Sequence, residues 1–92
     1  MSKKRNRLQI IYDILNVING KNGKIKQTNI LYKSNLSNQM FDGYMDELLQ
    51  KGFIVENQTK GGKTYSLTQK GFDYLNKYQM IVEFTNSFGL TE

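Results

Sequence analysis

Apolar residues near the start of the chain recur with a helical period. One stripe has members three or four positions apart: Leu8, Ile11, Leu15 and Ile18. A second stripe beside it consists of Ile10, Ile14 and Val17. The pattern predicts a helix over residues 3–19, ended by Gly20. A helix with so wide an apolar face is expected to be covered from two sides.

Two shorter helices are predicted in the middle of the chain. Residues 26–34 form the first, with Ile30 and Leu31 facing inward. Residues 38–51 form the second, and its apolar residues also have helical spacing: Met40, Phe41, Tyr44, Met45, Leu48 and Leu49. Ser37 is the expected N-cap, because its hydroxyl can accept a first-turn N–H. Helices joined by so short a turn indicate a helix-turn-helix, although two simply packed helices fit the same pattern.

The period changes from helical to alternating after residue 52. The β-branched and aromatic residues 53–57 predict a strand. Residues 64–68 predict the returning strand, with Tyr65 and Leu67 on one face. The "TKGGK" stretch between them is the expected turn, because glycine adopts positive φ without steric cost. A two-stranded hairpin is marginally stable alone, so we expect it to lean on the helices.

The last helix, capped by Thr68, carries more apolar residues than one face can hold. Those expected to turn back onto the domain are Phe72, Leu75 and Val82. A second seam has coiled-coil spacing and consists of Tyr74, Tyr78, Ile81, Thr85 and Phe88. One small domain cannot easily cover both seams, so we expect a two-fold homodimer through the second seam. The alternative is a last helix that folds wholly onto its own domain.

Charge is segregated along the 92-residue chain, whose formal net charge is +5. Residues 1–33 carry eight basic residues and one acid, and residues 57–70 carry three basic residues and no acid. Residues 34–56 carry one basic residue and four acids, and residues 71–92 carry one and three. Two basic blocks therefore flank an acidic segment. This balance favours a polyanionic partner such as nucleic acid.

Several classes of chemistry are disfavoured by composition. The sequence has no Cys and no His, which removes disulfides and the commonest metal ligand and general base. Asp42 and Asp46 share a helix face but have no third converging ligand, and Gly61 and Gly62 precede a strand rather than the helix of a phosphate loop. We expect no enzyme activity, no cofactor and no metal. The apolar runs are too short to span a membrane, so we expect a cytoplasmic protein. If its polyanionic partner is DNA, we expect it to be nucleoid-associated.

The order of elements is helix, helix, helix, strand, strand, helix. A helix-turn-helix followed by a hairpin with a basic tip, here residues 60–63, is the winged-helix arrangement. The expected fold class is therefore mainly α with a β-hairpin wing. Residues 1–70 are expected to form a winged-helix DNA-binding domain with a basic N-terminal arm, and residues 71–92 a C-terminal dimerisation helix.

Three stretches resemble a known family: "KRNRLQIIYDIL", "ILYKSNLSNQMFDGYMDELLQKGFI" and "KTYSLTQKGFDYL". Together they span most of the chain. They are similar to the small archaeal winged-helix DNA-binding proteins that carry a C-terminal dimerisation helix. The resemblance implies a transcriptional regulator or chromatin-associated protein that binds double-stranded DNA. The alternative is a winged-helix module that binds protein, favoured by the acidic residues Asp42, Asp46, Glu47 and Glu56.

The resemblance also implies roles for particular residues. Base reading would fall to the start of the helix at residue 38, at Ser37, Asn38, Gln39 and Asp42. Phosphate contacts would come from Lys26, Lys33, Lys60 and Lys63. The wing backbone would approach the DNA closely at Gly61 and Gly62. A flexible basic arm would add salt-sensitive affinity through Lys3, Lys4, Arg5 and Arg7. The competing interpretation is that these are ordinary exposed polar residues and a solubilising terminus.

Overall fold

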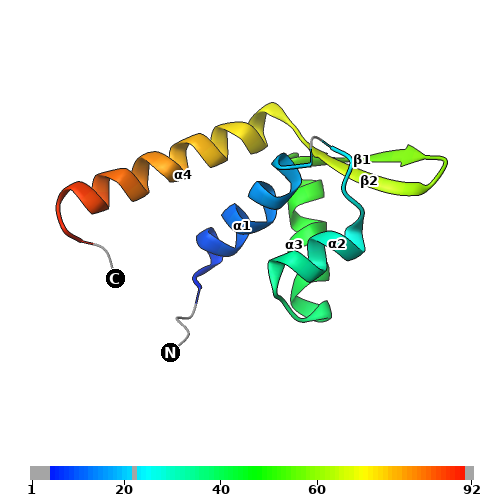
Figure 1. Ribbon diagram of the computed structural model, residues 1–92, viewed down its shortest axis with the longest axis horizontal. Coiled ribbons are helices and arrows are strands. Elements are labelled where there is room, and N and C mark those ends of the chain that lie inside the picture. The colour runs from blue at the N-terminus through cyan, green and yellow to red at the C-terminus, as the bar shows by residue number, and fades with distance from the viewer. Residues whose placement is uncertain (1–4, 22, 91–92) are drawn as a thin grey trace.

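A computed structural model describes residues 5–21 and 23–90 (Figure 1). Its elements, in chain order, are α1 Arg7–Asn19, α2 Gln27–Ser34, α3 Asn38–Gln50, β1 Ile54–Thr59, β2 Gly62–Leu67 and α4 Gln69–Ser87. This order confirms the predicted fold class, mainly α with a β-hairpin. Among the described residues, no helix is long and apolar enough to cross a membrane.

Helices α1, α3 and α4 begin at side-chain caps. Ser37 and Thr68 are the N-caps of α3 and α4, as predicted, and accept hydrogen bonds from the N–H groups of Met40 and Gly71. The start of α1 differs from the predicted residue 3. Its N-cap is Asn6, whose side-chain oxygen accepts the Gln9 N–H at 2.8 Å. Capping by Asn6 therefore starts the helix later than the apolar period alone implied.

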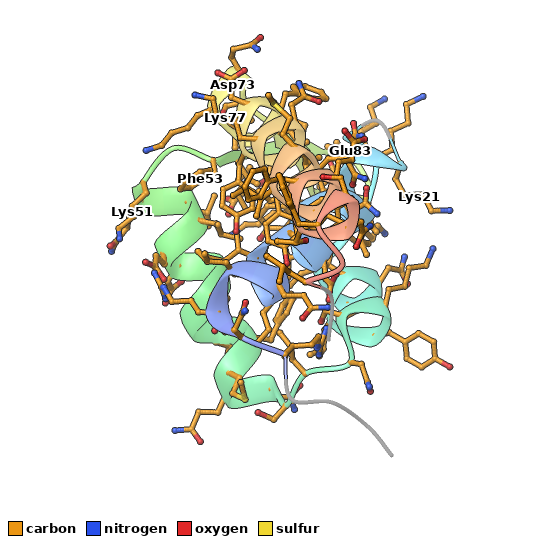
Figure 2. The ribbon with its side chains drawn as sticks, turned by 90° about the vertical axis from the view of Figure 1, so that its left-hand side faces the viewer. Lys21, Lys51, Phe53, Asp73, Lys77 and Glu83 are labelled. Atoms are coloured by element: carbon orange, nitrogen blue, oxygen red, sulfur yellow. The ribbon has the colours of Figure 1, made fainter. Side chains whose placement is uncertain are left out.

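Helix α1 lies at the centre of the domain, between α4 and the α2–α3 pair (Figures 1 and 2). It contacts α2, α4 and β2. Both of its predicted stripes contribute buried residues: Ile10, Ile11, Ile14, Leu15 and Ile18. Leu8, predicted to belong to the first stripe, is instead 52% exposed. The prediction that α1 is covered from two sides is therefore confirmed, except at its first turn.

The hairpin is antiparallel, with Cα partners running from Ile54↔Leu67 to Thr59↔Gly62. Its turn consists of Lys60 and Gly61, and Gly62 has φ +119°, a conformation that favours glycine. Both strands extend closer to the tip than predicted, because two residues suffice for the turn. On the other side of β2, Ile25 forms a bridge with Tyr65, whose N–H donates to the Ile25 carbonyl at 3.1 Å. This bridge ties the hairpin to the helical part of the domain.

Gly71, in the first turn of α4, lies against the backbone that leads into β1. A β-carbon at Gly71 would lie 2.4 Å from the Phe53 carbonyl oxygen, whereas one at Gly43 in α3 would have nothing within 4 Å. Alanine normally stabilises an exposed helix over glycine by about 1 kcal/mol. We expect Gly43→Ala to raise the free energy of unfolding by up to that amount. We expect Gly71→Ala to lower it by about 1–3 kcal/mol, because the backbone must shift.

Urea denaturation of both variants measures this difference. Gly43→Ala is the matched control, since both glycines lie in helices and gain the same methyl group. A stabilised Gly71→Ala protein would contradict the close approach of α4 to the Phe53 carbonyl.

Candidate nucleic-acid interface

The N-terminus of α3 presents polar side chains at the surface of the helix-turn-helix. All the predicted base-reading residues are exposed: Ser37, Asn38, Gln39 and Asp42. The Ser37 hydroxyl is also the N-cap of α3, since it accepts the Met40 N–H at 3.3 Å. The side chains of Asn38, Gln39 and Asp42 make no hydrogen bond to any other described residue. They are therefore available to a ligand at the start of the helix.

The wing tip and the start of α2 bring lysines from two parts of the chain together. A β-carbon on Gly61 would lie 3.7 Å from the Lys26 ammonium, so Lys26 stands beside the turn that holds Lys60. The Lys63 ammonium lies 3.4 Å from the Glu56 carboxylate on the neighbouring strand. Neither Lys26 nor Lys60 forms an ion pair with a described residue. Lys33 is also exposed, but it lies in the last turn of α2, away from the wing.

Tyr65 links the wing to α2, a role that the sequence did not indicate. Its hydroxyl lies 3.2 Å from the Gln27 side-chain oxygen and 3.5 Å from a Glu56 carboxylate oxygen. Burial raises the pKa of this phenol, and the neighbouring Glu56 charge raises it further, so the hydroxyl stays neutral and can donate. Alternation along β2 predicted only that Tyr65 and Leu67 share one face, because a bond to α2 depends on tertiary packing.

The acidic character of α3 is weaker than the sequence suggests. Glu47 pairs with Arg7 and with the Lys51 ammonium, the latter at 2.8 Å. Hydrogen bonds from Arg7 and then from Lys51 lower the pKa of Glu47 to about 2. Glu56 is the acid that pairs with Lys63. On α3, this leaves Asp42 and Asp46 as exposed acids that form no ion pair with a described residue.

The predicted basic arm is only partly described. Lys3 and Lys4 lie outside the described residues. Arg5 donates to Asp13 and to the Asn35 carbonyl, and Arg7 begins α1, pairs with Glu47 and lies 6.0 Å from the centre of the Tyr44 ring. The prediction of a flexible arm is therefore wrong for Arg5 and Arg7. Their partners are distant in sequence, so composition alone did not reveal the pairing.

The tyrosines predicted for the dimer seam face α1 of their own chain. The Tyr78 ring stacks on Tyr12 with centroids 4.6 Å apart, and the Tyr74 hydroxyl donates to the Leu8 carbonyl. Burial, and to a smaller extent Tyr78, raise the pKa of Tyr74 to about 12, which keeps this donor protonated. Both rings and the Tyr74 hydroxyl therefore have partners within the domain, and contact of these tyrosines with a second protomer stays a prediction.

The exposure of other α4 residues also differs from the prediction. Phe72, predicted to turn inward, is exposed, whereas Thr85 is half-buried and donates its hydroxyl to the Val82 carbonyl. The C-terminal half of α4 and its C-cap expose large apolar side chains, which we call the α4 stripe: Met80 (65%), Ile81 (56%), Phe84 (60%) and Phe88 (66%). Two of these, Ile81 and Phe88, were predicted for the second seam. The domain itself leaves this stripe uncovered.

The fold and the exposed face of the helix-turn-helix define a winged-helix protein. Residues 4–86 match the model of the winged helix-turn-helix family, and the chain belongs to that family. An uncharacterized protein of Methanocaldococcus jannaschii is 35% identical over 79 residues, covering 79% of this chain and 79% of the relative. A second uncharacterized protein of that organism is 38% identical over 80 residues, and the match covers 87% of this chain but only 35% of the relative. The predicted resemblance to archaeal winged-helix proteins is thus confirmed.

Solved structures show the same fold. Sso10a-2, a DNA-binding protein from Sulfolobus solfataricus, superposes with a TM-score of 0.75 at 20% identity, covering 91% of this chain and 85% of that chain. The PcaV transcriptional regulator from Streptomyces coelicolor superposes with a TM-score of 0.75 at 15% identity, covering 86% of this chain and 60% of that chain.

Proposed function

We propose that the protein binds double-stranded DNA as a winged-helix transcriptional regulator or chromatin-associated protein. The observation that carries this proposal is the exposed polar start of α3 together with the lysines at the wing. Helix α2 joins the two, because it begins beside the wing at Lys26 and ends at the turn before α3. The DNA-binding protein and the transcriptional regulator of similar fold also support it.

In this proposal α3 is the recognition helix and enters the major groove by its N-terminus. Asn38 and Gln39 would pair with adenine, and Asp42 would accept a hydrogen bond from cytosine, while Ser37 adds a hydroxyl. Phosphate contacts would come from Lys26, Lys33, Lys60 and Lys63. The absence of side chains at Gly61 and Gly62 lets the turn of the hairpin approach the duplex closely.

A module that binds protein instead of DNA is the competing function. The observation in its favour is the pair of exposed carboxylates on α3, Asp42 and Asp46, which would repel phosphate. The ion pairs of Glu47 and Glu56 weaken this alternative, because these two acids are neutralised within the domain. We therefore favour DNA.

Salt dependence separates the two functions. If four lysines each contact one phosphate, the logarithm of the binding constant falls against the logarithm of salt with a slope of about −3.6. A fourfold rise in salt then weakens binding roughly 10²-fold. Fluorescence anisotropy with a mixed-sequence duplex at 50 and about 200 mM salt measures this loss. No binding at the lower salt concentration would favour the protein-binding module.

We also propose a homodimer formed by the α4 stripe. Contiguous apolar side chains that are each more than half exposed are uncommon on monomers and mark interaction surfaces. Two copies of one stripe related by a two-fold axis cover each other, since the patch is the same on both protomers. The proposed interface includes Ile81 and Phe88 from the predicted seam, together with Met80 and Phe84. A dimer would present two α3 helices, and binding of the first would raise the effective concentration of the second.

A further inference from the structure

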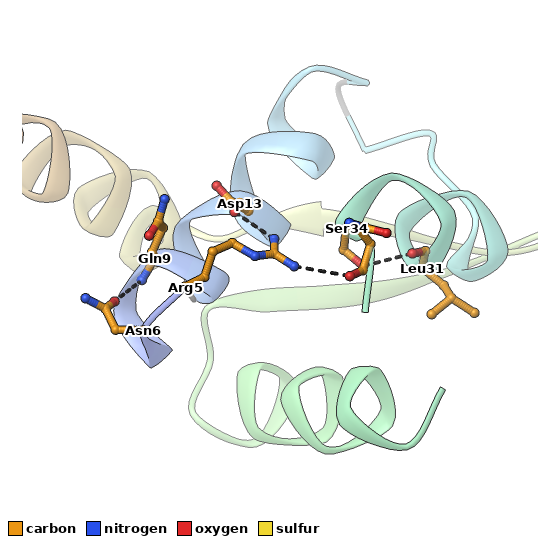
Figure 3. Close-up of polar contacts among 7 residues, drawn as sticks. Arg5, Asn6, Gln9, Asp13, Leu31 and Ser34 are labelled. Carbon is orange, nitrogen blue, oxygen red and sulfur yellow. Dashed lines mark hydrogen bonds and ion pairs between the residues drawn. The ribbon is translucent and has the colours of Figure 1, made fainter. Parts of the chain in front are cut away.

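Arg5 connects the segment before α1 to the turn between α2 and α3 (Figure 3). One terminal guanidinium nitrogen, Nη1, lies 2.9 Å from the Asp13 carboxylate, and the second terminal nitrogen, Nη2, lies 3.2 Å from the Asn35 carbonyl oxygen. The side chains of Arg5 and Asp13 are 26% and 33% exposed, so the pair is partly shielded from solvent. Asp13 lies on α1, which fixes one end of this connection to the core helix.

The other end of the connection holds the residue that reverses the chain between the two helices. Asn35 has φ 58° and ψ 44°, and among the described residues it is the one non-glycine residue with positive φ. Its carbonyl lies at the C-terminus of α2, where the last carbonyls have no partner within the helix and the dipole attracts a cation. The buried Ser34 hydroxyl donates to the Leu31 carbonyl at 2.9 Å and closes the same helix end (Figure 3).

We infer that Arg5, held by Asp13, is a positioning residue for α3 and not a phosphate contact. Its carbonyl partner, Asn35, precedes the N-cap Ser37 by two residues, so holding this carbonyl fixes where α3 begins. The guanidinium donates hydrogen bonds to Asp13 and Asn35, so its charge already has partners within the protein. The consequence for DNA binding rests on the proposed function, whereas the effect on the turn does not.

One charge-conserving variant and one nearly isosteric variant test this role. Arg5→Lys keeps the positive charge but replaces a planar fork by a compact ammonium, which cannot span Asp13 and the Asn35 carbonyl in the same way. Asp13→Asn removes the carboxylate that orients Arg5. We expect both variants to speed amide hydrogen exchange at residues 36–41, measured on the free protein. Lys77→Arg is the control, because it also exchanges one cation for another but lies exposed on α4 outside the helix-turn-helix, and it should leave this exchange unchanged.

DNA binding then separates positioning from direct contact. A positioning role predicts that Arg5→Lys and Asp13→Asn both weaken binding several-fold, with the salt slope of the parent retained. A phosphate contact predicts that Asp13→Asn strengthens binding, because it frees Arg5 and removes a negative charge, and that Arg5→Ala reduces the slope by about 0.9. Unchanged exchange at residues 36–41 in both Arg5→Lys and Asp13→Asn, or stronger binding by Asp13→Asn, would overturn the inference. A parent that binds no DNA would overturn the proposed function, while faster exchange would still support the role of Arg5 at the turn.

Discussion

Replacing Ile81 by Asp is expected to turn a dimer into a monomer at micromolar concentration. Ile81 is 56% exposed in one chain and belongs to the α4 stripe, so pairing of two stripes would bury it. A carboxylate there would lose its hydration without gaining a partner. On a duplex with two half-sites, losing the second protomer should weaken binding by roughly 10²-fold or more. Sedimentation gives the mass, and anisotropy gives the affinity.

Asn76→Asp is the matched control for Ile81→Asp. Asn76 is an exposed residue of α4 outside the stripe, so the substitution adds the same charge to the same helix without entering the proposed interface. Circular dichroism checks that each variant keeps its helicity. A monomeric parent at micromolar concentration would contradict the dimer, and so would a fully dimeric Ile81→Asp protein with native helicity.

The elements of the fold could be predicted from the sequence where their signals are local. The N-caps Ser37 and Thr68 act within one helical turn, and the apolar period of α1 is contained in one segment. The bridge between Ile25 and Tyr65, in contrast, joins segments far apart in the chain, and no local pattern specifies such a partner.

The candidate site likewise has residues with local sequence signals and residues whose positions depend on distant contacts. The exposed residues at the start of α3 follow from the predicted helix and its cap. The faces of α4 do not, because apolar residues lie nearly all round this helix and two different stripes fit its period. The choice between them depends on Tyr12 and the Leu8 carbonyl, which receive the Tyr78 ring and the Tyr74 hydroxyl. The ion pairs of Arg5 with Asp13 and of Arg7 with Glu47 also depend on how the folded segments meet, and no local pattern specifies them.

The second large effect is expected at the wing. Lys60→Ala combined with Lys63→Ala should weaken DNA binding by about tenfold or more, and to the same extent for all sequences, because phosphate contacts carry no base information. Removing two such contacts should also reduce the magnitude of the salt slope by about 1.8. Lys63 forms an ion pair with Glu56, so we expect Lys60→Ala to account for more of the loss in affinity than Lys63→Ala.

Lys77→Ala serves as the control for the wing variant. Lys77 lies on α4 and points away from α1, as does Asp73 (Figure 2), and it belongs to neither the wing nor the helix-turn-helix. Its replacement removes a positive charge from the protein as a whole. Unchanged DNA affinity in this variant would show that the loss at the wing is not an effect of net charge.

The most direct test of DNA binding through the wing is one comparison. The affinity of the parent and of the Lys60→Ala, Lys63→Ala variant is measured on the same duplex over a series of salt concentrations. We expect the variant to bind more weakly at low salt and to show a slope smaller by about 1.8. A variant that binds as tightly as the parent, with the same slope, would contradict the assignment of the hairpin as a DNA-binding wing.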